Sequence, residues 1–551
     1  MRPIVSAGEM RAIDEETIRD HVSGLTLMER AGKAVRDHVV SRWLAGQSEQ
    51  AVTRPKKGGQ ARRTQVKKAR VLVVCGKGNN GGDGMVVARL LKRDGWPVAL
   101  YLAGKPSEVK GDALTNLKRC ARASLKARRL AADTWEEFLA DLGRAEVVVD
   151  AVFGTGFEGE PRGLAAEVIE AINRRGSTGG AVVAVDIPSG VNATTGGASL
   201  AVQATSTITM GLPKRGHLFF PGKALTGELV VADIGIPAEV VERARVAVML
   251  PGRGDVKAAM PVRSPDAHKG SCGHVACICG STGLTGAAAL ASLSALRAGA
   301  GLVTLAVPRS LNAIMETKLT EVMTLPVEET AQGSFSVHAL GALQDLVGRA
   351  DCVALGPGLS RNPETAELVR ALVPALGKPC VLDADGINAF AGHADLLGSG
   401  GAPLVVTPHV GEAARLFGVD KAEIAAGRIE FAREAARRLG VVLVLKGAPT
   451  VVAGPEGEVF VNPTGNCVLA TAGSGDVLTG LIAGLLAQGA PALEAAWLGA
   501  YVHGWCGDIM LFTCGGVGFL AGEISRQIPH AITALTHSGP RWDVLRRMGP
   551  S

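Results

Sequence analysis

The feature that most constrains this fold is a short apolar run that leads through closely spaced glycines into a helical pattern. Residues 71–76 (VLVVCG) run into residues 76–84 (GKGNNGGDG), and residues 85–93 continue with helical spacing. Glycine permits sharp turns and lets backbone N–H groups approach an anion, while a helix N-terminus adds a favourable partial charge. No Lys-Ser/Thr pair follows, so this is not the Walker pattern. The segment predicts a strand, an anion-binding glycine loop and a helix.

The same alternation of apolar runs and helical stretches continues along the chain. In the N-terminal half the expected strands are 71–76, 97–103, 146–154, 181–186, 206–210 and 228–235. In the C-terminal half they are 273–280, 302–308, 352–356, 379–385, 403–409, 441–447 and 450–454. Strands separated by helices are typical of largely parallel, doubly wound sheets. Ser6 and Glu9 form a capping-box pattern for an early helix, and residues 27–44 and 421–439 have amphipathic helical spacing.

The length of 551 residues is too great for a single hydrophobic core. The pattern loosens and prolines recur between residues 237 and 265, where we place the domain boundary. We therefore expect the α/β class, with two doubly wound three-layer α/β/α domains. The expected spans are residues 1–237, a linker at 238–264, and residues 265–545.

The basic charge is concentrated in one segment. The net charge is +6, and residues 54–70 alone hold eight basic and no acidic residues. We interpret about 46–70 as a basic insertion, so the rest of the chain is near neutral and no nucleic-acid partner is expected. An aromatic content of 4% also argues against a stacking platform for single strands.

Cysteines and apolar runs indicate the compartment. Cys272, Cys277 and Cys279 lie close together, but no further metal ligand accompanies them, so buried free thiols are expected. No apolar stretch approaches the ~20 residues that a membrane span requires. We therefore predict a protein of the reducing cytoplasm with no membrane partner.

Polar residues follow several expected strands of the N-terminal half. Asp150 ends VVVD, and Asp186 ends AVVAVD just before Ser189. A single aspartate there is commonly a turn or capping residue. Ligands of open α/β sheets bind outside the carboxyl ends of the strands, so several such residues together indicate a site. Asn80 can offer a carbonyl oxygen to a hard cation, and Asp83 can accept from a ribose hydroxyl.

At this point residues 1–237 resemble the YjeF N-terminal family, the NAD(P)H-hydrate epimerases, through EMRAID, LMERAG, GNNGGDG, DAVFGTG, DIPSG and PKRG. The resemblance implies a Rossmann-like domain that contacts the hydrated nucleotide through Asn79, Asn80, Gly81, Gly82, Asp83, Gly154, Thr155, Gly156, Phe157, Glu158, Gly159, Glu160 and Asp186. It implies a potassium ion held by Asn80, Asp150 and Ser189. Asp186 with Lys214 is the candidate catalytic acid/base pair. Thr205 stands where the family usually has Asp.

A second glycine segment lies near the C-terminus. TAGSGD (471–476) precedes an apolar helical run, so Gly473, Ser474 and Gly475 would expose N–H groups to a phosphate. Asp476 would be the base, as in ribokinase-type phosphoryl transfer. The plain structural alternative is a capped helix.

The surrounding motifs KGAPTVV, NPTGN, GPGL and TPH favour the functional interpretation. Residues 265–510 resemble the ADP-dependent NAD(P)H-hydrate dehydratases, a branch of the ribokinase-like fold. The resemblance implies hydrate contacts at Ala287, Gly358, His409 and Asp476, and adenine-nucleotide contacts at Lys446, Gly447, Ala448, Pro449, Thr450 and Gly475. Ser474 and Gly386 depart from the usual family residues.

The two resemblances together imply a bifunctional repair enzyme. The N-terminal half would interconvert R and S hydrates of NADH and NADPH. The C-terminal half would dehydrate the S form with ADP and Mg²⁺, giving NAD(P)H, AMP and phosphate. Small-molecule substrates and a homo-oligomer are expected, and ADP is favoured over ATP only by the resemblance. A ribokinase-like kinase, and a scaffold role for the N-terminal half linked to nucleic acid through residues 54–70, are the alternatives.

Overall fold

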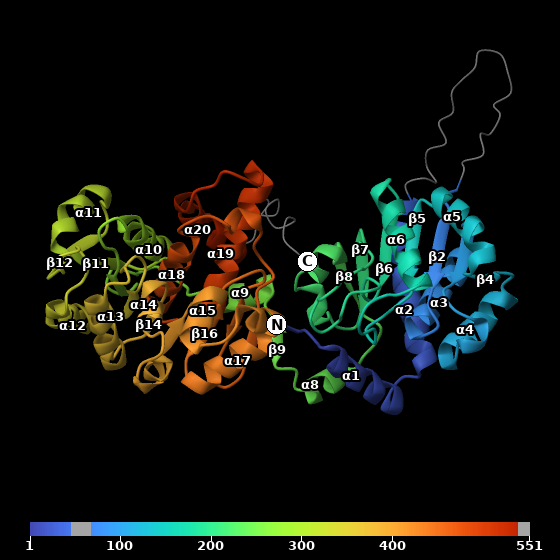
Figure 1. Ribbon diagram of the computed structural model, residues 1–551, viewed down its shortest axis with the longest axis horizontal. Helices are drawn as coiled ribbons and strands as arrows, with labels where there is room; N and C mark the ends of the chain where they lie inside the picture. The colour runs from blue at the N-terminus through green and yellow to red at the C-terminus, as the bar shows by residue number, and fades with distance from the viewer. Residues whose placement is uncertain (46–67, 538–551) are drawn as a thin grey trace, which may run out of the picture. The chain divides into compact units, whose positions relative to one another are not determined.

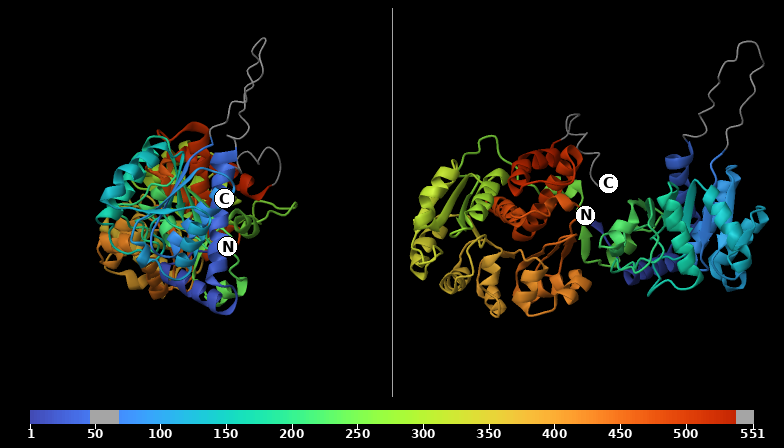
Figure 2. Two further views of the ribbon diagram at one scale, coloured as in Figure 1. Left: turned by 90° about the vertical axis from the view of Figure 1, so that its right-hand side faces the viewer. Right: turned by 45° about the horizontal axis from the view of Figure 1, so that its top comes forward.

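The computed structural model describes residues 1–45 and 68–537, which fall into two compact units. One unit is Pro3–Val246, and the other combines Met1–Arg2 with Ala247–Ser551. Most of the basic insertion, residues 46–67, lies outside the described residues. Each unit is an α/β layer structure with helices on both faces of a sheet (Figures 1 and 2), which confirms the predicted fold class.

The N-terminal unit contains a seven-stranded parallel sheet in the order β4-β3-β2-β5-β6-β7-β8. The strands are β2 (Val71–Cys75), β3 (Val98–Leu102), β4 (Ala127–Arg129), β5 (Val147–Ala151), β6 (Ala181–Val185), β7 (Ser206–Met210) and β8 (Glu228–Ala232). The chain order reverses between β2 and β5, so the sheet has its topological switch point there.

Helices cover both faces of this sheet. They are α1 (Ala7–Asp20), α2 (Gly24–Val39) with the π-helical turn η1 (Val40–Leu44), α3 (Asn79–Arg93), α4 (Gly111–Arg122), α5 (Trp135–Arg144), α6 (Leu164–Ser177), α7 (Gly222–Thr226) and α8 (Ala238–Arg243), with short 3₁₀ turns η3 (Pro106–Glu108), η4 (Ala132–Thr134) and η5 (Arg215–His217). Alternate residues of β2 face opposite sides: Val71 and Val73 pack with α2, α3 and α4, while Leu72 packs with α5 and α6. Both faces are thus buried, and the continuous apolar run follows from that burial.

The C-terminal unit contains an eleven-stranded sheet in the order β1-β9-β18-β17-β16-β15-β14-β13-β10-β11-β12. The strands are β1 (Arg2–Pro3), β9 (Val248–Leu250), β10 (His274–Ile278), β11 (Leu302–Pro308), β12 (Met323–Val327), β13 (Cys352–Leu355), β14 (Cys380–Leu382), β15 (Leu404–Val406), β16 (Val442–Leu445), β17 (Val451–Ala453) and β18 (Val459–Val461). The strands β10 to β16 are parallel, and β17 is antiparallel to both β16 and β18. The order reverses between β10 and β13.

The helices of this unit also form two layers (Figure 1). They are α9 (Arg253–Ala259), α10 (Thr285–Ala298), α11 (Asn312–Lys318), α12 (Leu340–Arg349), α13 (Pro363–Leu372), α14 (Asp385–Asn388), α15 (Val410–Phe417), α16 (Lys421–Ala426), α17 (Arg428–Leu439), α18 (Ser474–Ala487), α19 (Ala492–Cys514) and α20 (Ala521–Thr536), with 3₁₀ turns η6 (Arg309–Leu311), η7 (Val337–Ala339), η8 (Val373–Ala375), η9 (Ala394–Ser399) and η10 (Cys467–Leu469). The largest core cluster joins α10, α18, α19 and α20 to one face of the sheet.

Two local expectations were wrong. The predicted glycine loop is largely helical, because α3 begins at Asn79, with Gly78 as its N-cap. The expected helix 421–439 is two helices, interrupted at Gly427, whose φ of −131° and ψ of 51° break the helical path. The predicted capping box is confirmed: the Ser6 N–H donates to Glu9 Oε2 at 2.7 Å, and the Glu9 N–H donates to Ser6 Oγ at 3.2 Å.

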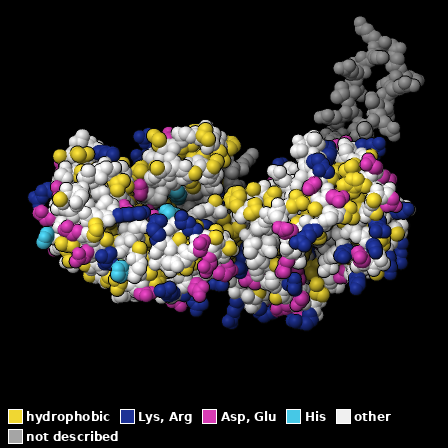
Figure 3. Space-filling view, in the orientation of Figure 1, with side chains coloured by type: hydrophobic (Ala, Val, Ile, Leu, Met, Phe, Trp, Pro, Cys, Tyr) yellow, Lys and Arg dark blue, Asp and Glu magenta, His cyan; other side chains and the backbone are white. Residues whose placement is uncertain are grey.

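Cys272, Cys277 and Cys279 are buried free thiols, as expected. On the face shown in Figure 3, basic and acidic side chains are intermixed over both units. Within residues 1–45 and 68–537, no helix is long and apolar enough to cross a membrane.

The glycines of α3 permit close packing, which gives a first prediction. A Cβ on Gly84 would lie 2.6 Å from Ala151 Cβ and 2.8 Å from Cys75 Sγ. We expect Gly84→Ala to destabilise the N-terminal unit by about 1–3 kcal/mol, because buried atoms must move. Hydrogen exchange of the β2 and β5 amides in the full chain measures this loss.

The matched control is Gly143→Ala in α5, where an added Cβ would meet nothing within 4 Å. That change should be neutral or stabilise by up to about 1 kcal/mol, through helix propensity. Equal exchange protection in the two variants would contradict the packing argument.

Candidate active sites

A cavity of about 1070 Å³ lies within the N-terminal unit at the carboxyl ends of its central strands. Its walls include residues 76–80 after β2, residues 152–158 after β5, and Asp186 after β6. Helix α1 also contributes to the wall, through Met10, Arg11 and Asp14 among others. The cavity is therefore at the switch point, where open α/β sheets bind their ligands.

Many residues predicted for the first site line this cavity. They are Asn79, Asn80, Asp83, Gly154, Thr155, Gly156, Phe157, Glu158, Asp186 and Lys214. Gly159 and Glu160 are not among the lining residues, and neither are Gly81 and Gly82. The latter two are buried in α3, where a Cβ on Gly81 would lie 2.0 Å from the Gly76 carbonyl oxygen. Gly81 thus lets the start of α3 approach the end of β2. A Cβ on Gly82 would instead lie 2.6 Å from Met28 Sδ, so Gly82 lets α3 pack closely against α2.

Asp186 and Lys214 form a buried ion pair in the wall of the cavity. The Lys214 side chain is 1% exposed and that of Asp186 is 13% exposed. Lys214 Nζ donates to Asp186 Oδ1 and also to Thr209 Oγ1 at 2.9 Å, and the Met210 N–H donates to Asp186 Oδ1 at 3.0 Å. Burial acts to raise the pKa of Asp186, but the Lys214 ammonium and these donors hold that pKa below its ordinary value. Asp186 is thus an ionised carboxylate that faces the cavity.

Asn80 of the cavity wall lies close to the buried residues Asp150 and Ser189, because Asn80 Nδ2 and Ser189 Oγ both approach the Phe153 carbonyl oxygen. The Ser189 N–H and Oγ donate to the two Asp150 carboxylate oxygens at 2.8 and 2.6 Å, and Asn80 Nδ2 donates to the Phe153 carbonyl at 2.7 Å. Burial raises the pKa of Asp150 to about 6, although donors from Ser189 and Val152 oppose the rise. Asn80 Oδ1 is buried and has no hydrogen-bond partner among the described residues. This open oxygen fits a cation ligand.

Asp14 is a candidate residue that sequence reasoning missed. Met10, Asp14 and Ile18 follow one another at helical spacing on α1, and all three line the cavity. Burial raises the pKa of Asp14 to about 6, with Lys214 lowering it and Asp186 raising it. The sequence could have indicated Asp14, because a carboxylate stands there between Met10 and Ile18 at a helical spacing where an apolar side chain is expected.

The second candidate site surrounds the first turn of α18. Gly473 is the N-cap with φ 89°, a left-handed conformation that favours glycine, and Ser474, Gly475 and Asp476 open the helix. Lys446 Nζ lies near them, since it would be 3.3 Å from a Cβ on Gly475. Burial raises the pKa of Asp476 to about 7, and Asp383 adds to the rise while Lys446 opposes it. An aspartate with this pKa is suited to general-base work at neutral pH.

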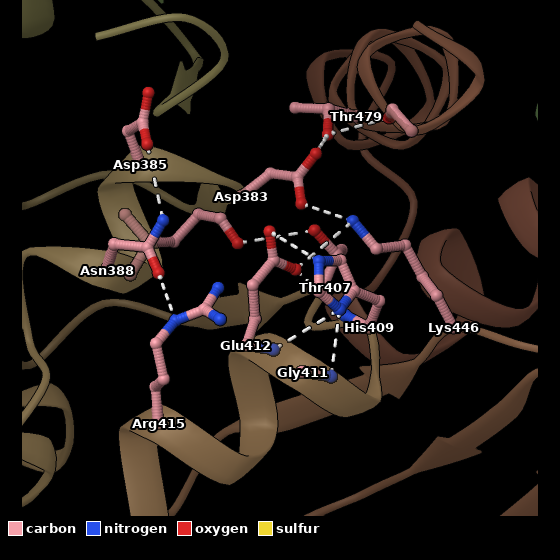
Figure 4. Close-up of polar contacts among 12 residues, drawn as sticks. Asp383, Asp385, Asn388, Thr407, His409, Gly411, Glu412, Arg415, Lys446 and Thr479 are labelled. Carbon is pink, nitrogen blue, oxygen red and sulfur yellow. Dashed lines mark hydrogen bonds and ion pairs between the residues drawn. The ribbon is translucent and has the colours of Figure 1, made fainter. Parts of the chain in front are cut away.

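Asp383 and Glu412 hold the Lys446 ammonium in place (Figure 4). Lys446 Nζ is 2.7 Å from Asp383 Oδ1 and 3.7 Å from Glu412 Oε2. Asp383 lies within the expected strand 379–385 and was assigned no role from the sequence. An aspartate directly after a buried strand was the available signal.

His409 is the N-cap of α15 and half-exposed. Its Nδ1 accepts from the N–H groups of Gly411 at 2.9 Å and Glu412 at 3.2 Å (Figure 4). Burial lowers the pKa of His409, while Glu412 acts to raise it. An accepting Nδ1 requires the tautomer with hydrogen on Nε2. That nitrogen lies 3.5 Å from Glu412 Oε1, so His409 is oriented by the first turn of its own helix.

The remaining predicted residues form two local groups. Ala287 and Gly358 adjoin each other, because a Cβ on Gly358 would lie 3.1 Å from Ala287 Cβ. The segment 446–450 follows β16, and its carbonyls are held by Arg428 of α17. Arg428 Nη2 lies 3.2 Å from both the Leu445 and the Lys446 carbonyl oxygens and 3.0 Å from that of Pro449. Arg428 was also missed, since no motif in the neighbouring sequence indicates its role.

Comparisons with known proteins bear on both units. Residues 24–216 match the family model described as YjeF-related protein N-terminus, and residues 275–530 match the model described as NAD(P)H-hydrate dehydratase. The fold, the two sites and these matches define a class of fused proteins with one domain of each kind.

Relatives extend over the whole chain. The chain is 43% identical over 536 residues to the bifunctional NAD(P)H-hydrate repair enzyme Nnr of Moorella thermoacetica, covering 97% of each. It is 40% identical to the enzyme of that name from Thermofilum pendens, covering 84% of this chain and 87% of the relative. A solved ADP/ATP-dependent NAD(P)H-hydrate dehydratase from Bacillus subtilis is 31% identical, covers 52% of this chain and 98% of its own, and has a TM-score of 0.45. The chain belongs to the family of bifunctional NAD(P)H-hydrate repair enzymes, which confirms the resemblance inferred from its motifs.

The buried pair in the first site yields a second prediction. We expect Lys214→Met to destabilise the N-terminal unit by about 3–5 kcal/mol at neutral pH, because the Asp186 carboxylate loses its cation. Because Lys214 lowers the pKa of Asp186, the pair stabilises above the unfolded pKa and its contribution is lost as pH falls. The difference from wild type should therefore shrink under acid conditions.

Hydrogen exchange of β6 and β7 at neutral and acid pH measures this difference. Lys33→Met is the control, since it breaks an exposed pair with Asp37 and should cost under about 0.5 kcal/mol. A loss that is the same at both pH values would contradict the assigned ion pair.

Proposed function

We propose that the chain repairs hydrated NADH and NADPH through two activities. The N-terminal unit interconverts the R and S hydrates, and the C-terminal unit uses ADP to return the S hydrate to NAD(P)H with release of AMP and phosphate. The observation that carries this proposal is the 43% identity to a bifunctional repair enzyme over 97% of the chain, because that similarity spans both candidate sites.

In the N-terminal unit the start of α3 binds phosphate and the Asp186–Lys214 pair moves protons. The free N–H groups of the first turn of α3, with Gly78 as N-cap, favour an anion. Asp186 is ionised and faces the cavity, so it acts as the base, and Lys214 keeps it in that state. The residues Asn79, Asp83 and 154–158 line the space that the hydrate occupies.

Asn80, Asp150 and Ser189 would hold a potassium ion in this unit. The supporting observation is that Asn80 Oδ1 is buried and lacks a partner among the described residues. The Nδ2 of the same side chain donates to the Phe153 carbonyl. Bound there, the ion would supply positive charge beneath the substrate cavity and stabilise the segment after β5.

In the C-terminal unit the nucleotide lies along residues 446–450 and Gly475, and the hydrate along Ala287, Gly358 and His409. Asp476 takes the proton of the added hydroxyl while the hydroxyl oxygen attacks the terminal phosphorus of ADP, and AMP leaves. The N–H groups at the start of α18 and the Lys446 ammonium stabilise the transferring phosphoryl charge. Mg²⁺ bound with the nucleotide would neutralise phosphate charge.

Phosphorylation makes the added hydroxyl a good leaving group. The ring nitrogen donates its lone pair as the C–O bond breaks and phosphate departs. Loss of the neighbouring ring proton then restores the double bond of NAD(P)H. A ribokinase-like kinase, the second candidate, would instead stop at a stable phosphorylated product.

One assay separates these outcomes and forms the third prediction. Purified protein is mixed with R and S NADH hydrates, ADP and Mg²⁺, and the return of NADH absorbance is followed. We expect recovery of both epimers. No recovery with ADP or ATP overturns the dehydratase, and recovery of the S form alone overturns the epimerase.

Asp476→Asn is the matched variant for this assay. It should lower dehydration on the order of 10²- to 10⁴-fold, the usual contribution of general-base catalysis, and leave R/S interconversion unchanged. Since the pKa of Asp476 is about 7 and the base must be ionised, wild-type dehydration should fall as pH drops below that value. Dehydration near wild type in the variant would remove Asp476 from the role of base.

The potassium site gives a fourth prediction. Adding K⁺ in place of N-methylglucamine should increase hydrogen-exchange protection of residues 152–158, because the ion orders this segment. Asn80→Leu, which lacks the amide oxygen, should abolish the increase, and β14 of the other unit should not respond. A K⁺ effect that persists in Asn80→Leu would exclude this ligand set.

The assembly and its location follow as further parts of the proposal. We expect a homo-oligomer that acts on small molecules in the cytoplasm. The buried free cysteines support a reducing compartment.

A further inference from the structure

Asp383 is a fully buried carboxylate that joins two separate elements of the second site. Its side chain is 1% exposed and follows β14 directly. Oδ1 accepts from Lys446 Nζ at 2.7 Å, and Oδ2 accepts from Thr479 Oγ1 at 2.7 Å (Figure 4). Each oxygen therefore has one short hydrogen bond, and the two donors come from different parts of the fold.

The two donors carry the proposed phosphate-binding groups. Lys446 opens the segment 446–450, and its ammonium is next to Gly475. Thr479 lies in the first half of α18, and its Oγ1 is also 3.2 Å from the Gly475 carbonyl oxygen. Asp383 thus ties the ammonium and the start of the helix to the same strand end.

This tie matters because a lysine side chain is long and flexible. An ammonium that is already oriented stabilises phosphoryl charge without reorganisation at the moment of reaction. Charge-assisted hydrogen bonds to a buried carboxylate are among the stronger ones in proteins. Glu412 is farther from the ammonium, at 3.7 Å, so Asp383 is its principal anchor.

We propose that Asp383 is a positioning residue of the dehydratase site, which fixes the Lys446 ammonium against the start of α18 where the phosphoryl group of ADP is transferred. This inference rests on the proposed dehydratase function and assigns Asp383 no contact with substrate. It also explains Gly475, because any side chain there would crowd Lys446 Nζ.

The charge of Asp383 also affects the pKa of the proposed base, Asp476. After burial, Asp383 is the largest influence that raises the pKa of Asp476, Lys446 opposes it, and Asp385 and Glu412 add smaller effects. His503 of α19 contacts Ser474 Oγ at 3.2 Å, and burial lowers its pKa to about 4, so it is neutral. The Cys279 thiol is also nearby, and burial raises its pKa.

The test uses Asp383→Asn in the full chain. Asparagine keeps the size but replaces one accepting oxygen with an N–H₂ donor and removes the charge. We expect kcat/KM for ADP to fall on the order of 10- to 100-fold, with a raised KM for ADP. The acid limb of the dehydration pH profile should move to lower pH, a readout that a merely structural role would not move in that direction. R/S interconversion should be unchanged.

Asp395→Asn is the matched control. It removes an aspartate that pairs with Arg438 at 2.8 Å but is 82% exposed, so every rate should stay at the wild-type level. If Asp383→Asn does not fold, Thr479→Val and Thr479→Ser test the same anchor independently. The valine variant loses one anchor and should raise the KM for ADP severalfold, and the serine variant should restore it.

A double-mutant cycle with Lys446→Met decides whether Asp383 acts through Lys446. In that background Asp383→Asn should add little, so the two effects will not multiply. Multiplying effects, an unchanged KM for ADP in Asp383→Asn, or equal KM values in Thr479→Val and Thr479→Ser would overturn the inference. Wild-type protein without ADP-dependent recovery overturns the proposed function itself, whereas active wild type with an equally active Asp383→Asn overturns only this inference.

Discussion

Burial of the central strands on both faces is the constraint on which both sites depend. All five residues of β2 and of β5 are buried, and so are the four residues of β13. Such strands have almost no place for polar side chains along their length, because unpaired polar groups are costly in the core. Chemistry therefore collects where the strands end, at Gly76, Asp186, Asp383 and Lys446.

In both units a lysine offsets the desolvation free energy of a buried aspartate. Asp186 is paired with Lys214 in the N-terminal unit, and Asp383 with Lys446 in the C-terminal unit. In each pair the lysine follows a later strand than the aspartate, so strand order brings the two together. The first pair faces a cavity, whereas the Asp383 carboxylate of the second pair also accepts from Thr479. Each pair has a neighbouring aspartate with a raised pKa, Asp14 in the first unit and Asp476 in the second.

Continuous apolar runs predicted most strands, because strands buried on both faces have that pattern. Short edge strands were missed for the same reason: β4 is Ala-Arg-Arg, and β12 includes Pro326. The glycines of α3 were interpreted as a loop, since their close contacts with β2 and Met28 exist only in the folded unit. Asp186 and Asp476 were assigned to the candidate sites from motifs. Asp383 was not, because its bond to Lys446 spans 63 residues and depends on the order β14-β15-β16.

The contacts of Arg428 have a consequence for the segment it holds. A trans peptide is planar, and its C=O and N–H point in opposite directions. When the Lys446 and Pro449 carbonyls turn toward the guanidinium, the N–H groups of Gly447 and Thr450 are directed the other way. Arg428 of α17 thereby orients the peptide groups of residues 446–450, so that hydrogen-bond donors and not acceptors face away from the guanidinium. Selectivity for an anion can in this way originate from a residue that never meets it.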